Sequence, residues 1–276
     1  MSRWGRFNGG WASAALVMFA MIVGSAADPP PRRLKLPGEL ELTLRERRPA
    51  AEGTNRIVVR ERTVRWPAAR TAIIVCDMWD GHYCESAAQR VKVMAPRMNA
   101  VLTAARAHGV QIIHAPSGTM HMYEGTPHRE RMKQAPAAVP PVPILPWCDL
   151  DPETEPPMPV TVKPCSCDDP VVGPEVQKYT RQHPLLDILG YDVVSDSASE
   201  IYTYLTDEGI DHVVIMGVHT NMCVLGRSFG IRQMVRLGKT VVLARDLTDA
   251  MYDPRQPPHV SHARGTELVI EHIEQH

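Results

Sequence analysis

Two hydrophobic patterns alternate along the chain. Continuous apolar runs, typical of strands buried on both faces, are TAIIVCD, VQIIHAPS, YDVVSD, IDHVVIMG and KTVVLARD, at residues 71–77, 110–117, 191–196, 210–217 and 239–246. Helically spaced segments follow or precede them at residues 86–109, 197–209, 223–238 and 261–276. This alternation predicts an α/β protein with a three-layer α/β/α fold, whose mostly parallel, doubly wound sheet has five or six strands.

Two regions fall outside the alternation. Residues 56–66, RIVVRERTVRW, alternate branched and charged side chains, which predicts an edge strand or hairpin within an N-terminal β extension at residues 28–67. Prolines cluster between about 117 and 184, which predicts a long irregular insertion. Pro96 indicates a kink in the first helix, or a helix that begins near it. The remaining pattern fits one domain at residues 68–276.

The first 27 residues are typical of a signal peptide. Arg3 and Arg6 precede a 13-residue apolar run, and Ser25 and Ala27 are small residues of the kind a signal peptidase reads. The run is too short to span about 30 Å of hydrocarbon comfortably as a helix, so a stable membrane anchor after cleavage is not expected. We therefore expect export to the periplasm or the extracellular space, with cleavage before Asp28.

The net charge of the chain bears on which kinds of molecule it binds. The 30 basic and 31 acidic residues nearly cancel, so no general attraction to nucleic acid or to anionic membranes is expected. A small-molecule substrate becomes the expected partner. No cofactor is expected, and a homo-oligomer is left open.

Export would place the cysteines in an oxidising compartment. Cys148, Cys165 and Cys167 lie in the proline-rich insertion, which has little apolar surface to hold it in place. A disulfide from Cys148 to Cys165 or Cys167 would supply that constraint. A metal site built on the CSC sequence is the alternative, although it lacks the paired spacing of a zinc module.

Several polar residues follow the predicted strands. Ligands of doubly wound sheets bind at the carboxyl ends of the strands, and these ends carry Asp77, His114, Asp196, Asp246 and the turn before Cys223. At the first turn of a helix Cys223 would be favoured as a thiolate nucleophile, and the helix N–H groups could hold an oxyanion. Asp77 could carry the proton. Alternatively, Cys223 is a small buried apolar residue and Asp77 a turn residue.

The sequence resembles the isochorismatase-like cysteine hydrolases, which include nicotinamidases, N-carbamoylsarcosine amidases and isochorismatases. TAIIVCDMWDGHYC is similar to the first-strand motif with its aspartate at Asp77, and GIDHVVIMGVHTNMCV to the nucleophile turn with its cysteine at Cys223. The resemblance implies the same fold and a cis peptide between Val218 and His219. It also implies that the N–H groups of Met222 and Cys223 form the oxyanion site.

The resemblance fails at one catalytic position. The family has a lysine where this chain reads VVSD, and Asp196 takes its place with the opposite charge. An aspartate there would oppose thiolate formation. Lys163 and Lys178, both in the insertion, are the cations that could fold back, although their spacing gives no support.

Other residues carry weaker predictions. Trp79 either walls the substrate pocket or caps the core, and His219 and Asn221 lie in the turn itself, so contact with a ligand is expected alongside His114 and Asp196. Histidines that could act as a base or bind a metal are His82, His114, His121, His128 and His219, but the Asp-x-His spacing of a metal site is lacking and no metal is predicted. Three arginines are expected on a solvated or interface face of the helix: Arg227, Arg232 and Arg236.

Three functions are compatible with this pattern. The first is an exported cysteine-dependent hydrolase that cleaves a C–N bond of a small amide-like substrate through a thioester. The second is a non-hydrolytic ligand-binding descendant that lost the chemistry with its lysine. The third, a thiol redox protein, is disfavoured because no CxxC sequence lies near Cys223.

Overall fold

The structure is a computed structural model that describes residues 33–54, 56–162 and 166–276. The expected signal peptide at residues 1–27 lies outside the described residues. Within the described ranges, no helix is long and apolar enough to cross a membrane.

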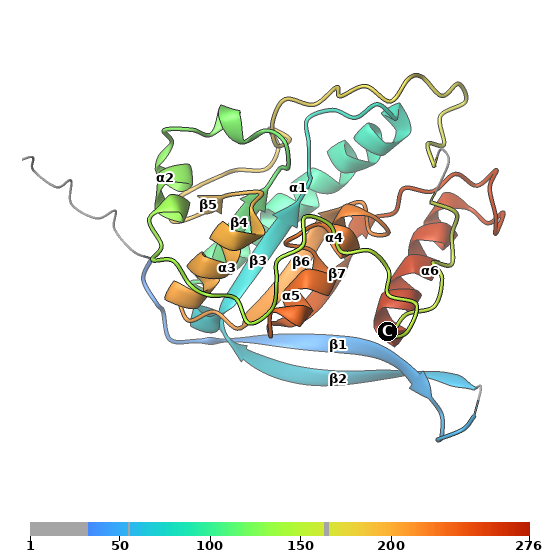
Figure 1. The fold of residues 1–276 in the computed structure, drawn as a ribbon, viewed down its shortest axis with the longest axis horizontal. Coiled ribbons are helices and arrows are strands. Elements are labelled where there is room, and N and C mark those ends of the chain that lie inside the picture. The colour runs from blue at the N-terminus through green and yellow to red at the C-terminus, as the bar shows by residue number, and fades with distance from the viewer. Residues whose placement is uncertain (1–32, 55, 163–165) are drawn as a thin grey trace, which may run out of the picture. The chain divides into compact units, whose positions relative to one another are not determined.

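A five-stranded sheet with the order β5-β4-β3-β6-β7 forms the centre of the fold (Figure 1). All four strand pairs are parallel. The strands are β3 (Thr71–Cys76), β4 (Gln111–Ala115), β5 (Val193–Val194), β6 (His212–Val218) and β7 (Thr240–Asp249). The order reverses beside β3, where β3 lies between β4 and β6, so the predicted doubly wound sheet is confirmed and the crevice that binds ligands in such sheets is expected there.

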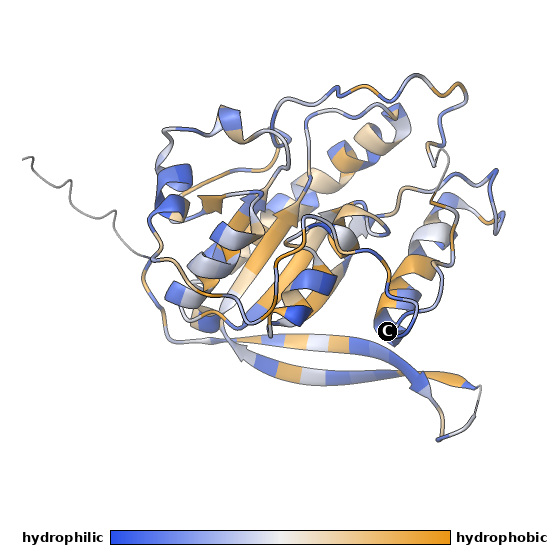
Figure 2. Cartoon of the chain, in the orientation of Figure 1, coloured by the Kyte–Doolittle hydropathy of each residue, from blue (hydrophilic) through white to orange (hydrophobic). Residues whose placement is uncertain are grey.

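The sheet has an apolar layer on each face. Ile74 of β3 packs in a cluster that includes Ile201 and Met234 from the helices of one face, whereas Val75 packs in a second cluster with Leu102 from the opposite helix. The central strands are accordingly apolar along their whole length (Figure 2). Burial on both sides explains why β3 is a continuous apolar run rather than an alternating one.

The helices follow the predicted order with three differences, the first being that α2 lies within the insertion expected to be irregular. They are α1 (Glu85–Ala107), α2 (Pro127–Lys133), α3 (Ala198–Asp207), α4 (Cys223–Gly226), α5 (Ile231–Arg236) and α6 (His262–Gln275), with short 3₁₀ turns η1 (Ala68–Arg70) and η2 (Met120–Met122). The first helix runs through Pro96 instead of beginning there. The single helix expected at residues 223–238 is wrong, because Arg227 turns to an extended conformation and separates α4 from α5.

The N-terminal extension is an antiparallel hairpin of β1 (Glu39–Pro49) and β2 (Ile57–Pro67). Its second strand covers the segment predicted from the alternation of branched and charged residues. Arg45 and Arg47 of β1 form ion pairs with Glu274 and Glu271 of α6. The extension is therefore confirmed as β structure and is tied to the last helix by charge.

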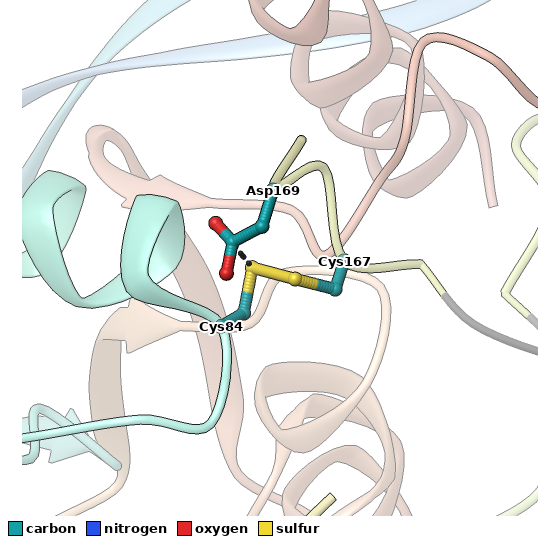
Figure 3. A group of neighbouring side chains, drawn as sticks. All are labelled: Cys84, Cys167 and Asp169. Atoms are coloured by element: carbon teal, nitrogen blue, oxygen red, sulfur yellow. Dashed lines mark hydrogen bonds between the residues drawn. A yellow bond between two sulfur atoms is a disulfide. The ribbon is translucent and has the colours of Figure 1, made fainter. Parts of the chain in front are cut away.

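A disulfide anchors the proline-rich insertion to the start of α1. It joins Cys84 to Cys167, while the carboxylate of Asp169 accepts hydrogen bonds from the backbone N–H groups of Glu85 and Ser86 (Figure 3). The predicted pairing of Cys148 is wrong: Cys148 is a buried free thiol, 3.1 Å from the amide oxygen of Gln233. Since Cys84 lies 83 residues before its partner, local spacing within the insertion could not identify the pair.

Candidate active site

Asp77 lies directly after β3 and is completely buried. Its backbone is in the left-handed region, with φ of 48°. Two contacts with the neighbouring strand hold it there: its N–H donates to the Ala115 carbonyl at 3.1 Å, and its Oδ1 accepts from the Ser117 N–H at 2.8 Å. A side chain so fixed keeps its second carboxylate oxygen directed at a defined partner.

The cysteine turn begins where β6 passes closest to β3. Gly217 has φ of 115° and any Cβ there would collide with the Cys76 backbone, which explains why glycine begins the turn. The peptide between Val218 and His219 is cis, as the resemblance implied. Thr220 then donates its N–H to the Asp249 carbonyl, and the chain enters α4 at Cys223.

Arg227 completes a group of three with Asp77 and Cys223. Its Nε donates to Asp77 Oδ2 at 3.0 Å, and its side chain is 30% exposed. The prediction of a solvated face is wrong for this residue and for Arg232, which binds Glu155, whereas Arg236 is exposed. Arg227 follows Cys223 by four residues but lies just after α4 in an extended conformation, so helical spacing alone does not place it beside Asp77.

Asp196 does not enter this group. Its Oδ2 instead accepts the Gly118 N–H at 2.8 Å. Lys178 places its Nζ 4.0 Å from Glu85 at the surface, and Lys163 lies outside the described residues. The positive charge beside Asp77 therefore comes from the helix after the nucleophile, and not from the strand before it.

Electrostatics favour a neutral thiol in the resting site. Burial raises the pKa of Cys223 well above its usual value, and the negative charge of Asp77 raises it further, while Arg227 lowers it. Burial alone would lower the pKa of Arg227, but Asp77 raises it, so the guanidinium stays charged. Burial and Asp77 thus oppose the effect of the helix start, and α4 is only a single turn in a buried site.

The turn N–H groups differ from the expected arrangement. Met222 donates its N–H to the His219 carbonyl at 3.0 Å, so this group is already occupied. The His219 N–H is directed at the Cys223 sulfur. The Cys223 N–H has no backbone partner outside its own helix in the described part of the chain, and it remains the donor available to an oxyanion.

Two further predicted residues have internal partners. His114 is completely buried, with Nδ1 bound to Gln182 at 2.9 Å and Nε2 bound to Asp192 at 3.0 Å, so its predicted contact with substrate is not supported. The amide of Asn221 is similarly engaged by both backbone groups of Met251, and serves to hold the segment after β7.

Trp79 lies at the site together with a residue that the sequence did not indicate. Its Nε1 donates to the Ser117 carbonyl, and its ring stacks on Tyr179 with centroids 4.2 Å apart. Asp77, Arg227 and Cys223 all influence the pKa of Tyr179, which burial raises, so this residue of the insertion lies close to the reactive group. Asp80 fixes the segment next to Tyr179, because its carboxylate accepts hydrogen bonds from the backbone N–H and the hydroxyl of Thr180.

Two histidines, the half-buried His82 and the buried His219, lie beside the turn. Their rings are 5.1 Å apart, and together with Asp77 and Trp79 they line a small cavity against α1. Burial lowers the pKa of His82 to about 4 and that of His219 to about 3, so both are neutral at physiological pH. The Nε2 of His219 is buried without a hydrogen-bond partner in the described residues.

Within the described residues, the predicted histidines do not form a group of metal ligands. His121 is exposed, and His128 binds the Asp192 carbonyl. One group of three potential ligands in the described ranges is Cys84, Cys167 and Asp169 (Figure 3). Because its two sulfur atoms are joined in a disulfide, neither is a thiolate able to bind a metal.

Comparisons with known proteins identify the family. The family model described as the isochorismatase domain matches residues 71–269. Similar solved structures include a cysteine hydrolase from Pseudomonas syringae pv. phaseolicola 1448A, with 21% identity, 76% of this chain and 88% of that chain covered, and a TM-score of 0.44. Another is an isochorismatase-like hydrolase from Alkaliphilus metalliredigens, with 16% identity, coverage of 75% and 88%, and a TM-score of 0.41. No curated protein sequence matches the chain.

Proposed function

Because the chain belongs to the isochorismatase family, we propose that it is a cysteine-dependent hydrolase that cleaves a C–N bond of a small amide-like substrate. The observation that carries the proposal is the group formed by Cys223, Asp77 and Arg227. It holds a nucleophile, a proton carrier and a cation in contact at the carboxyl edge of the sheet. A non-hydrolytic binder is the alternative because the family's lysine is missing. Arg227 favours the hydrolase, since it supplies a positive charge beside Asp77.

The reaction begins from the neutral thiol. As the Cys223 sulfur attacks the carbonyl carbon, its proton passes to Asp77, and the carbonyl oxygen gains negative charge that the Cys223 N–H stabilises. Asp77 then gives that proton to the leaving nitrogen as the C–N bond breaks and a thioester remains. Water attacks the thioester and transfers a proton to Asp77. The C–S bond breaks, the acid is released, and Cys223 recovers its proton.

Arg227 acts on the proton carrier in this scheme. A completely buried carboxylate without a partner would be driven toward its protonated form, in which it could not accept the thiol proton. The guanidinium supplies the paired positive charge and holds Oδ2 in place. Arginine is suited to this task since it remains charged when partly buried.

The test is turnover of a panel of small primary amides, followed by ammonia release. Wild type is expected to hydrolyse at least one amide, and Cys223→Ala and Asp77→Ala are expected to be inactive while keeping the wild-type melting temperature within a few degrees. A thioester of the expected mass, trapped on Cys223 by acid quenching, would establish the intermediate. Activity retained in Cys223→Ala would exclude the mechanism.

Export forms part of the proposal. The signal-like first 27 residues and the disulfide between Cys84 and Cys167 both suit an oxidising compartment. N-terminal sequencing of the protein recovered from the periplasm or the medium tests it, with Asp28 expected as the first residue. An intact N-terminus in a cytoplasmic protein would contradict export.

A further inference from the structure

We infer that the two terminal nitrogens of Arg227 bind an anionic group of the substrate, so that the preferred substrates are small amides carrying a carboxylate. The inference rests on the proposed function for the identity of the bond that is cleaved. Its own basis is that Nη1 and Nη2 of Arg227 make no hydrogen bond within the described residues.

The guanidinium of Arg227 is held by one nitrogen alone. Nε donates to Asp77, whereas Nη1 and Nη2 have no hydrogen-bond partner in the described part of the chain. Neither is among the buried atoms that lack a partner, so both are accessible from outside. Other partly buried arginines use more of their nitrogens: Arg232 places Nε and Nη2 on Glu155 and Nη1 on the Cys148 carbonyl, and Arg106 places Nε and Nη2 on Asp192, with Nη1 alone unpartnered.

The position of these free donors ties them to the reaction. The nitrogens of a guanidinium share one rigid plane, so an anion on the Nη atoms would lie a few ångström from Asp77. Arg227 is also within one helical turn of Cys223. A carboxylate held there would place a neighbouring amide carbonyl beside the sulfur, which is the kind of positioning that bidentate arginine contacts provide.

The surroundings do not oppose an anion. Arg227 balances the charge of Asp77, and the resting Cys223 is neutral because burial and Asp77 raise its pKa.

Trp147 completes this side of the site. Its ring lies 5.8 Å from the Arg227 guanidinium and is 37% exposed. Any Cβ at Gly226 would collide with the same ring, so the glycine permits the tryptophan to lie against α4. The aromatic face holds the guanidinium from one side and leaves its edge, where the donors are, open to a ligand.

The inference is tested by binding rather than turnover, in Cys223→Ala protein that cannot form the thioester. Oxamate, malonamate and succinamate are compared by calorimetry with the neutral diamides oxamide, malonamide and succinamide. At least one anion is expected to bind about tenfold more tightly than its matched diamide, and the preference should weaken at high salt. Adding Arg227→Gln to the Cys223→Ala protein should abolish the preference for the anion. Adding Arg227→Lys instead should retain part of the preference, because the charge remains while the forked guanidinium is lost.

Arg236→Gln serves as the matched control, since Arg236 is exposed on α5, and it should leave the preference unchanged. Thermal unfolding of each variant confirms that the protein binding the probe is folded. Equal binding of all anions and diamides, or a preference that survives Arg227→Gln, would overturn the inference. Ammonia release by wild type is measured separately, so failure of the carboxylate site and failure of hydrolysis are distinguishable.

Discussion

Arg227 donates from Nε to Asp77 Oδ2 at 3.0 Å, and the two residues approach the nucleophile from different elements. Asp77 follows β3 and is completely buried, whereas Arg227 ends the single turn of α4 that begins at Cys223. The nucleophile and the cation thus lie on one short segment of the chain. The proton carrier is fixed independently by the sheet.

Removing the cation should lower both activity and stability. Arg227→Gln leaves Asp77 buried without its charged partner, and we expect kcat/KM to fall about 10²–10³-fold, as when a charge-stabilising donor is lost. The free energy of unfolding should fall by about 2–3 kcal/mol, less than for a fully buried pair because Arg227 is partly exposed. Steady-state kinetics and urea unfolding measure the two effects.

Arg227→Lys separates charge from geometry in the same assays. It should recover part of the activity lost in Arg227→Gln, since the ammonium retains the charge beside Asp77. The exposed Arg236→Gln should match wild type. A fully active Arg227→Gln enzyme would remove Arg227 from the mechanism.

Alkylation of Cys223 should be slow at neutral pH and accelerate as the pH is raised. Burial and Asp77 raise the pKa of the thiol, so little thiolate is present near pH 7. Asp77→Asn removes the second of these causes and should increase the rate about tenfold at pH 7.5, whereas Arg227→Gln should decrease it. The rate is followed by peptide mass after iodoacetamide treatment, which distinguishes Cys223 from the buried thiols Cys76 and Cys148. Rapid labelling of wild type near pH 6.5 would contradict a neutral resting thiol.

The pattern of apolar residues predicted the sheet well because burial on both faces leaves a strong local signal. Val75 and Ile74 point to opposite helical layers, so a continuous run such as TAIIVC could only be an inner strand. Asp77 follows β3 directly, and Cys223 begins the helix after the short turn that ends β6, so the sequence indicates both positions. Their positions at one edge depend only on the parallel order of the strands.

The partners of these residues were harder to predict, because they depend on where the insertion and the helix break fall. Arg227 was assigned to a solvated face on the assumption of one continuous helix, and the break after Gly226 turns it toward Asp77. Tyr179 stacks on Trp79, and Cys167 forms a disulfide with Cys84, both of which lie after β3. The insertion reaches them by a long path without a hydrophobic periodicity from which its course could be predicted. Such contacts between distant segments leave no mark in local spacing.

The disulfide between Cys84 and Cys167 should contribute about 2–5 kcal/mol to the free energy of unfolding. Chain-entropy arguments give about 4–5 kcal/mol for residues 83 apart, and measured values are often lower. Urea unfolding with and without reductant measures the difference. Cys84→Ser/Cys167→Ser protein should unfold at the same urea concentration in both conditions, and Cys148→Ser should keep the dependence. Equal stability of wild type with and without reductant would show that the bond is not formed.

His82 should make the protein less stable in mild acid. Its folded pKa is lowered, chiefly by burial, to about 4, whereas the unfolded value is about 6.5. Between these values the unfolded chain binds the extra proton, so stability is full above pH 6.5 and falls as the pH drops toward 4. The loss attributable to His82 is about 3 kcal/mol over that range, at 1.36 kcal/mol for each pKa unit.

His82→Asn isolates this effect. Nδ1 of His82 accepts the Cys84 N–H at 3.1 Å, and the asparagine oxygen can accept from the N–H two residues ahead without titrating. Urea unfolding at pH 7.5, 6.5, 5.5 and 4.5 should therefore show a shallower fall for His82→Asn than for wild type. His121→Asn, at an exposed histidine, should follow the wild-type curve. If the His82→Asn and wild-type curves ran parallel, the buried ring would already be protonated or solvated in the folded state, and the acid sensitivity would have to arise from other groups.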